Sequence, residues 1–208
     1  MRHLFTFSAV LAACGIMAAD WPMWQHDAGR SGRSPTALPA ELHLQWSRQL
    51  PALTPCWEDA VNQDRMPIDR FYEPVVAGHV LVVASNRLDG LTAFDTRSGD
   101  QLWQTFTDAP VRLPPAIQGD RVMAVSDDGT CYAFALTDGR RQWATRLAMD
   151  GRRILGNGRL VSAWCARGGP VVADDLVYVG AGIWPFMGTS VWALEITDGT
   201  PRWRQDDL

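Results

Sequence analysis

Three long irregular stretches of the sequence hold the side chains that could bind a ligand. These stretches, residues 51–73, 148–169 and 182–190, contain carboxylates, an amide, guanidinium groups and indoles. Carboxylate and amide oxygens are ligands for Ca²⁺, and guanidinium groups hold carboxylate anions in bidentate pairs. The candidate ligand-binding residues are therefore Asp59, Asp69, Arg70, Arg153, Asn157, Trp164 and Arg167. The alternative is that they are solvated loop charges with a few anchoring aromatic side chains, and the sequence leaves both open.

The sequence assigns no catalytic residue and no set of metal ligands. His26, His43 and His79 stand apart, without the spacing of metal ligands, and no hydrolase, phosphate-binding or dinucleotide-binding motif occurs. The run Asp127-Asp128-Gly129 resembles a calcium loop, but we predict a hairpin turn there. All 19 basic Lys and Arg positions are Arg, so Schiff-base and general-base chemistry by Lys is excluded.

The four cysteines form no C-x-x-C pair, so they predict no zinc knuckle, redox motif or haem attachment site. Cys56 and Cys165 lie in two of the irregular stretches. A disulfide between them is one prediction for an oxidising compartment, and free thiols are the alternative.

Residues 1–19 have the features of a secretory signal peptide. A short basic start precedes an apolar run too short to span a bilayer, and small residues precede Asp20. An alternative is lipidation at Cys14, because the residues before it resemble a bacterial lipoprotein box. Both interpretations predict export to the periplasm or the cell exterior, either as a soluble protein or as a membrane-anchored lipoprotein. No later segment is apolar over the length of a membrane helix.

A repeat positions these stretches. Ala93–Trp103, Ala133–Trp143 and Ala193–Trp203 share an alanine, a glycine six residues later and a tryptophan four residues after that. Fixed offsets in three copies indicate a repeated supersecondary unit. The predicted structural residues are Ala93, Gly99, Trp103, Ala133, Gly139, Trp143, Ala193, Gly199 and Trp203, together with an isolated Trp46.

Each unit has the pattern of four short strands joined by tight turns. In the second unit, strands are predicted at 116–117, 121–126, 130–135 and 141–146, with Asp and Gly at the turns. Units at 74–108, 114–147 and 170–208 then predict an all-β protein, an incomplete β-propeller of four-stranded antiparallel blades. Each Trp would cover the gap to a neighbouring blade, because an indole buries about 200 Å².

The domain organisation follows from these units. After the leader come an N-terminal segment at 20–50, an insertion at 51–73 and the repeats at 74–208, which contain an insertion at 148–169. Residues 42–50 resemble an outer strand, with Trp46 in the docking position, so the sequence predicts about three blades and one closing strand. Propellers have about four to eight blades. We therefore expect the N-terminal part of a larger propeller, completion by further blades, or self-association.

The repeat resembles the tryptophan-docking motif of PQQ-type, quinoprotein-like propeller repeats. Ala93, Asp95, Ser98, Gly99 and Trp103 match that motif. In the later copies Ala135 and Glu195 replace the Asp, and Asp138 and Asp198 replace the Ser. Such repeats occur in quinoprotein alcohol dehydrogenases and in the lipoprotein of the outer-membrane β-barrel assembly machinery. The resemblance implies the fold, and it makes PQQ and Ca²⁺ the cofactors to consider, with an Arg on the quinone carboxylate.

The expected function is non-catalytic binding or scaffolding by an exported propeller. Strand direction alternates within a blade, so the three irregular stretches fall on one face, where a protein partner or a small ligand would bind. One alternative is a PQQ- and Ca²⁺-dependent alcohol or sugar dehydrogenase. Another is a β-barrel assembly lipoprotein, which requires lipidation of Cys14. A net charge of −4 with scattered Arg provides no basic stripe for nucleic acid.

Overall fold

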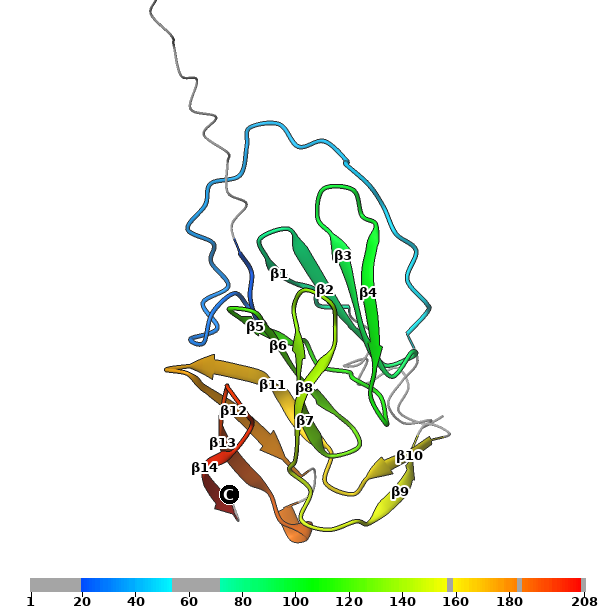
Figure 1. Ribbon diagram of the computed structural model, residues 1–208, viewed down its shortest axis with the longest axis vertical. Helices are drawn as coiled ribbons and strands as arrows, with labels where there is room; N and C mark the ends of the chain where they lie inside the picture. The colour runs from blue at the N-terminus through cyan, green and yellow to red at the C-terminus, as the bar shows by residue number, and fades with distance from the viewer. Residues whose placement is uncertain (1–19, 54–71, 157–158, 183–184, 207–208) are drawn as a thin grey trace, which may run out of the picture.

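The computed structural model describes residues 20–53, 72–156, 159–182 and 185–206, and it contains three four-stranded antiparallel sheets (Figure 1). The first blade is β1 (Val75–Ala77), β2 (Val80–Ser85), β3 (Gly90–Asp95) and β4 (Gln101–Phe106). The second is β5 (Ala116–Gln118), β6 (Arg121–Ser126), β7 (Thr130–Ala135) and β8 (Arg141–Arg146). The third is β11 (Ala166–Ala173), β12 (Leu176–Ala181), β13 (Ser190–Glu195) and β14 (Pro201–Asp206).

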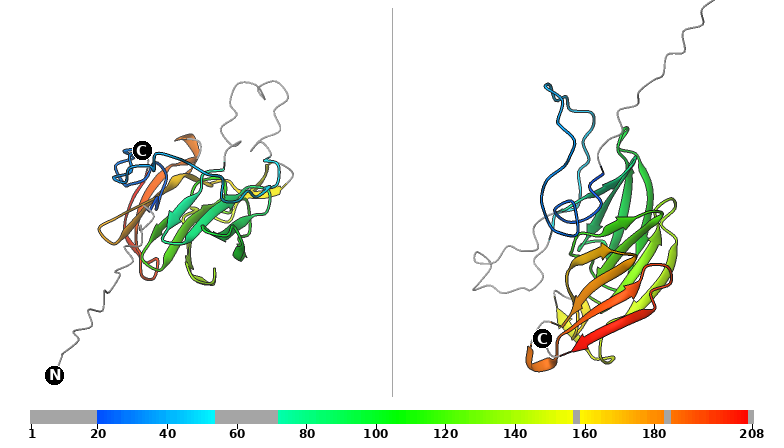
Figure 2. Two further views of the ribbon diagram at one scale, coloured as in Figure 1. Left: turned by 90° about the horizontal axis from the view of Figure 1, so that it is seen from above. Right: turned by 90° about the vertical axis from the view of Figure 1, so that its left-hand side faces the viewer.

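Two smaller elements accompany the blades. A hairpin, β9 (Arg153–Gly156) and β10 (Arg159–Ser162), lies between the second and third blades, and one 3-10 turn, η1 (Pro185–Met187), lies between β12 and β13. The strands of each blade pair in chain order, and the innermost strands β1, β5 and β11 lie side by side. In the right-hand view of Figure 2 the sheets follow one another from green to red. The prediction of an all-β, incomplete propeller is confirmed.

The second blade has the strands that its sequence predicts. β6, β7 and β8 begin and end at the predicted residues, and β5 is one residue longer. The turn at 127–129 joins β6 to β7, as predicted, with Gly129 at a φ of 81°. Alternation of β-branched and aromatic residues with Asp and Gly at the reversals was sufficient here, because each strand pairs with its chain neighbour.

The three blades repeat one register in detail. Ala93, Ala133 and Ala193 each pair across the sheet with the tryptophan of the outer strand, and a β-bulge follows each alanine. All three alanines are fully buried. The tryptophan is the third residue of its strand, where the sequence suggested the first. Trp103, Trp143 and Trp203 are therefore equivalent positions of one repeated unit.

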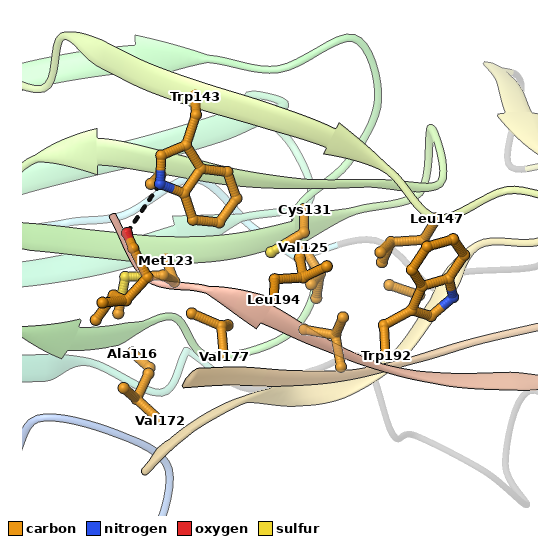
Figure 3. Close-up of a cluster of buried hydrophobic side chains, with 14 of the residues drawn as sticks. Ala116, Met123, Val125, Cys131, Trp143, Leu147, Val172, Val177, Trp192 and Leu194 are labelled. Carbon is orange, nitrogen blue, oxygen red and sulfur yellow. Dashed lines mark hydrogen bonds between the residues drawn. The ribbon is translucent and has the colours of Figure 1, made fainter. Parts of the chain in front are cut away.

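Each tryptophan ring lies on the glycine turn of the following blade. The indole Nε1 of Trp103 donates to the carbonyl of Leu136 at 2.8 Å, and a Cβ on Gly139 would lie 2.6 Å from the Trp103 ring. Trp143 donates in the same way to the carbonyl of Ile196 at 3.0 Å (dashed line in Figure 3) and lies against Gly199. The glycine thus supplies both a positive φ and an open surface for an indole.

The cores lie between blades rather than inside them. One cluster joins the first and second blades, and a second joins the second and third. The second cluster, drawn in Figure 3, includes Met123, Cys131, Val177, Trp192 and Leu194. Because both faces of a central blade are covered, its strands are apolar on both sides, as for Phe134 and Met123 in the second blade.

The N-terminal segment crosses the inner strands of all three blades. Trp21 forms a β-bridge with Val76 of β1, and the carbonyl of Pro22 accepts the amide of Ile117 in β5 at 2.6 Å. Met23 is buried in the cluster of the second and third blades, and Arg30 donates to the carbonyl of Gly169 in β11 at 3.2 Å. In Figure 2 this blue segment lies against the sheets.

Residues 42–50 correct one expectation. The sequence predicts an outer strand there, but no strand is assigned, because the described chain supplies no neighbouring strand for pairing. Trp46 nevertheless occupies a docking position. Its Nε1 donates to the carbonyl of Thr96 at 2.8 Å, and a Cβ on Gly99 would lie 2.6 Å from its ring. The segment therefore stands where the outer strand of a preceding blade would be. Among the residues that the structure describes, no helix has the length and apolar character needed to span a membrane.

Candidate functional site

The β9–β10 hairpin contacts the loops of all three blades, and we call this surface the long-loop face. The Arg159 guanidinium donates to the carbonyls of Asn86 at 3.2 Å and Arg87 at 3.1 Å, and it pairs with the Asp89 carboxylate. These contacts tie the hairpin to the loop between β2 and β3. The sequence insertion at 148–169 is therefore an ordered structure anchored on the propeller.

The second and third blades hold the other end of the hairpin. The amide of Ser162 donates to the carbonyl of Asp127 at 2.7 Å, in the loop between β6 and β7. The indole of Trp164 donates to the carbonyl of Met187 at 2.9 Å, in the segment between β12 and β13. Equivalent loops of three blades thus converge on one insertion, which fixes its orientation.

A buried ion pair stabilises the loops beneath the hairpin. Arg112 pairs with Asp127, and the side chains are only 8% and 6% exposed. The neighbouring Asp128 accepts a hydrogen bond from the Tyr132 hydroxyl at 2.6 Å. Burial and the bond to Asp128 both raise the pKa of Tyr132, so this phenol stays a donor. Both carboxylates of the predicted turn therefore have protein partners, and a calcium loop is not required to explain them.

The structure describes the side chains of only two of the seven candidate ligand-binding residues. Asp59, Asp69, Arg70 and Asn157 lie outside the described residues, and for Arg167 the structure gives the backbone pairing with Gly180 in β12. Arg153 is exposed on β9, whereas Trp164 is 6% exposed and lies beneath the guanidinium of Arg152, 5.2 Å from the ring centroid. Cys56, the predicted disulfide partner of Cys165, and Cys14 also lie outside the described residues.

The described residues do not fit a quinone cofactor. A stacking platform needs an open aromatic face, but Trp164 is buried under Arg152 and its N–H is bonded to Met187. Arg153 is exposed and does not share an enclosed pocket with it. Within the described part of the chain, no group of three or more His, Cys, Asp or Glu side chains could hold a metal ion. No chemical step through PQQ or Ca²⁺ is derived from these residues.

The long-loop face instead presents apolar side chains to solvent. Leu155 and Leu160 are Cα partners across the β9–β10 hairpin, and they are 73% and 58% exposed. Phe186 of η1 is 84% exposed. Sequence reasoning missed these residues because it selected charged and aromatic side chains. The available signal was the Asn157-Gly158 dipeptide between apolar residues, which is typical of a hairpin.

The fold and these contacts define a class of protein, the propellers whose blades are joined by docked tryptophans. The profile of the family described as outer membrane protein assembly factor BamB matches residues 24–162. The chain belongs to this PQQ-like repeat family. No curated protein matches the chain.

Solved structures of enzymes share the fold. The quinohemoprotein alcohol dehydrogenase of Comamonas testosteroni is 20% identical with a TM-score of 0.68, and the match covers 93% of this chain and 28% of the enzyme. A europium-containing methanol dehydrogenase is 18% identical with a TM-score of 0.67, covering 90% and 32% of the two chains. The quinohemoprotein alcohol dehydrogenase ADHIIG of Pseudomonas putida HK5 is 19% identical with a TM-score of 0.64, covering 90% and 26%. The chain thus spans about a third or less of these enzymes.

Proposed function

We propose that this chain is an exported propeller that binds a protein partner through its long-loop face and performs no chemistry itself. The observation that carries the proposal is the exposed Leu155–Leu160 pair on a hairpin that three blades anchor. Side chains held on a rigid support lose little conformational entropy on binding, so more of their contact energy contributes to affinity.

The surroundings of the leucine pair favour a partner with an apolar patch edged by acidic groups. Arg153 is exposed at the start of β9, and Arg152 is more than half exposed beside it. Arginine is enriched among residues that dominate interface energies, and apolar side chains at the centre supply the buried area. Arg159 is committed to the loop of the first blade and acts as an anchor.

Family membership supports the same proposal. The matching family is described by an assembly factor of the outer membrane, a protein named for a role with other proteins. Export follows from the predicted signal peptide at 1–19, and lipidation at Cys14 would add an anchor and favour the β-barrel assembly alternative. Mass spectrometry of the mature N-terminus distinguishes the two, with Asp20 expected for simple cleavage and a lipidated Cys14 for the lipoprotein.

Site-specific photocrosslinking in the native cell envelope tests the proposed surface. A photoreactive residue replaces Leu155 or Leu160 in turn, and the matched control replaces Leu38, which is 80% exposed on the N-terminal segment. We expect one partner protein, cross-linked through the same partner peptide, from both hairpin positions and not from position 38. The double variant Leu155→Asp/Leu160→Asp should abolish co-purification of that partner. Equal adducts from all three positions would contradict the proposal.

The likeness to alcohol dehydrogenases over 93% of the chain favours one second candidate, a PQQ-dependent oxidoreductase. Purified protein is incubated with PQQ and Ca²⁺ and assayed for dye-linked alcohol oxidation. We expect no quinone absorbance to remain with the protein after desalting and no turnover. Retained quinone with substrate-dependent dye reduction would establish the enzyme and overturn the non-catalytic proposal.

A further inference from the structure

One blade face lacks the cover that its counterparts have. We call this surface the forward face of the third blade, and it consists of Val171, Leu176, Tyr178, Val191 and Trp203. Their counterparts by register in the first blade are Val75, Val80, Val82, Leu91 and Trp103, each at most 7% exposed under the second blade. In the third blade all five are at least partly exposed, and Trp203 is 43% exposed. Contiguous apolar area of this kind marks an interaction surface.

The ligand that a docking tryptophan takes is defined by three repeats in this chain. Trp46, Trp103 and Trp143 each lie on a glycine, and each donates to the carbonyl three residues before that glycine. Trp203 has no hydrogen-bond partner for its indole among the described residues. The surface that fits it is therefore a glycine turn backed by the apolar rear face of a blade.

The rear face of the first blade carries such a turn, and its cover is the weakest of the three. Trp46 lies on Gly99 from a segment that belongs to no sheet. The segment is further held by Arg48, which donates to the Gly99 carbonyl and to Asp100 at 3.1 Å and is about half exposed. Trp103 and Trp143, in contrast, belong to outer strands of four-stranded sheets.

We propose that a second copy of this chain covers the forward face of the third blade, with Trp203 replacing Trp46 on the Gly99 turn of that copy. The exchange returns one indole to the same glycine and additionally buries the four other apolar side chains of the forward face, so association gains area that displacement of Trp46 does not cost. When both copies make the contact, the ring closes with six blades from two copies of three, within the range of about four to eight for propellers. The segment around Trp46 is thus a competitor that limits assembly.

Sedimentation velocity of the mature chain over a range of concentrations tests the contact. We expect a reversible dimer that Trp203→Ala weakens by at least about 30-fold, the effect of removing a dominant interface residue. Leu102→Ala is the matched control, because Leu102 is also 43% exposed and its counterpart Gln142 stays exposed under a docked blade. It should dimerise like the unmodified chain. Equal dimerisation of the Trp203→Ala variant would overturn the proposal.

Weakening the competitor should strengthen the dimer. Trp46→Ala removes the indole from Gly99, and Arg48→Ala, which leaves every aromatic in place, loosens the same segment if the first variant does not fold. Both variants should dimerise at lower concentration than the unmodified chain, and adding Trp203→Ala should abolish the gain. Unchanged association of the folded Arg48→Ala variant would contradict the competition.

Crosslinking identifies the surface that Trp203 occupies. A photoreactive residue at position 203 is irradiated in a mixture of isotopically light and heavy copies. We expect mixed light–heavy adducts to the peptide containing Thr96 and Gly99. Adducts confined to another surface, such as the β9–β10 hairpin, or the absence of any adduct between copies at concentrations where Arg48→Ala associates, would overturn the proposal.

Discussion

Gly139→Ala is the substitution that most sharply separates docking of the indole from turn geometry. Gly139 has a φ of 71°, and a Cβ there would lie 2.6 Å from Cε3 of Trp103. Favourable contact between carbon atoms needs about 3.5–4.0 Å, so the ring must withdraw by about 1 Å. The hydrogen bond from Trp103 to the carbonyl of Leu136, now 2.8 Å, stretches with it.

The magnitude follows from these displacements. An alanine in the left-handed region costs about 1–2 kcal/mol. The loss of a buried hydrogen bond costs about 1 kcal/mol. Re-exposing about a quarter of a 200 Å² indole costs a further ~1 kcal/mol at about 25 cal/mol/Å². We therefore expect Gly139→Ala to lower the free energy of unfolding by about 3–4 kcal/mol.

Gly119→Ala is the matched control in the same blade. Gly119 has a φ of 59°, and an added Cβ would have no atom within 4 Å, so only the backbone cost of about 1–2 kcal/mol applies. Equilibrium urea unfolding, followed by circular dichroism, compares the two variants alone and on a Trp103→Ala background. The difference of about 2 kcal/mol should disappear when the indole is absent. Equal costs for the two glycines in the presence of Trp103 would refute the docking argument.

Three further predictions use the same unfolding assay. Trp143→Ala should cost about 3–5 kcal/mol, because this side chain is 8% exposed, whereas Trp203→Ala should cost under about 1.5 kcal/mol in dilute solution; similar losses would contradict the assignment of an uncovered blade face. Arg112→Ala should cost about 3–5 kcal/mol by leaving the Asp127 carboxylate buried without its guanidinium, and a cost under about 1 kcal/mol would show that the pair is dispensable. The side-chain and backbone N–H groups of Arg97 lower the pKa of Asp95, so Asp95 stabilises the fold above the ordinary carboxyl pKa and loses that effect as pH falls further; Asp95→Asn should therefore flatten the fall in urea midpoint below about pH 4.

Local rules predicted the blades because each strand pairs with its chain neighbour. The alternation of apolar residues, the Asp and Gly turns and the repeated Ala-Gly-Trp offsets all act within about thirty residues of sequence. The substitution of Ser98 by Asp138 and Asp198 also becomes clear in the structure. Each side chain accepts the amide two residues later, in Asp100, Arg140 and Thr200, so the turn is preserved.

The contacts between blades were less accessible from the sequence. The glycine of the motif was predicted to relieve a strained turn, but its surface also receives the tryptophan of the preceding blade, a contact between Trp103 and Gly139 that no local pattern reports. The outer strand predicted at 42–50 failed for a similar reason, because strand pairing depends on neighbours far along the chain. The position of Trp46 was correct, since a single indole needs only the Gly99 turn.

The candidate site was the least predictable part. Charge and aromaticity selected Arg153 and Trp164, but the fold uses Trp164 as a buried anchor. The exposed residues are Leu155 and Leu160, which a search for chemistry does not select. Whether a side chain anchors an insertion or faces a partner depends on how three loops meet, and sequence spacing carries no information on that.

Exchange of the indole N–H protons with deuterium, followed by NMR of ¹⁵N-tryptophan-labelled protein in dilute solution, bears most directly on how the propeller is held together. The account predicts slow, cooperative exchange for Trp46, Trp103 and Trp143, whose N–H groups are bonded to backbone carbonyls of an adjacent blade, and fast exchange for Trp203. Fast exchange at Trp103 and Trp143, at the rate of Trp203, would mean that these rings do not join the sheets.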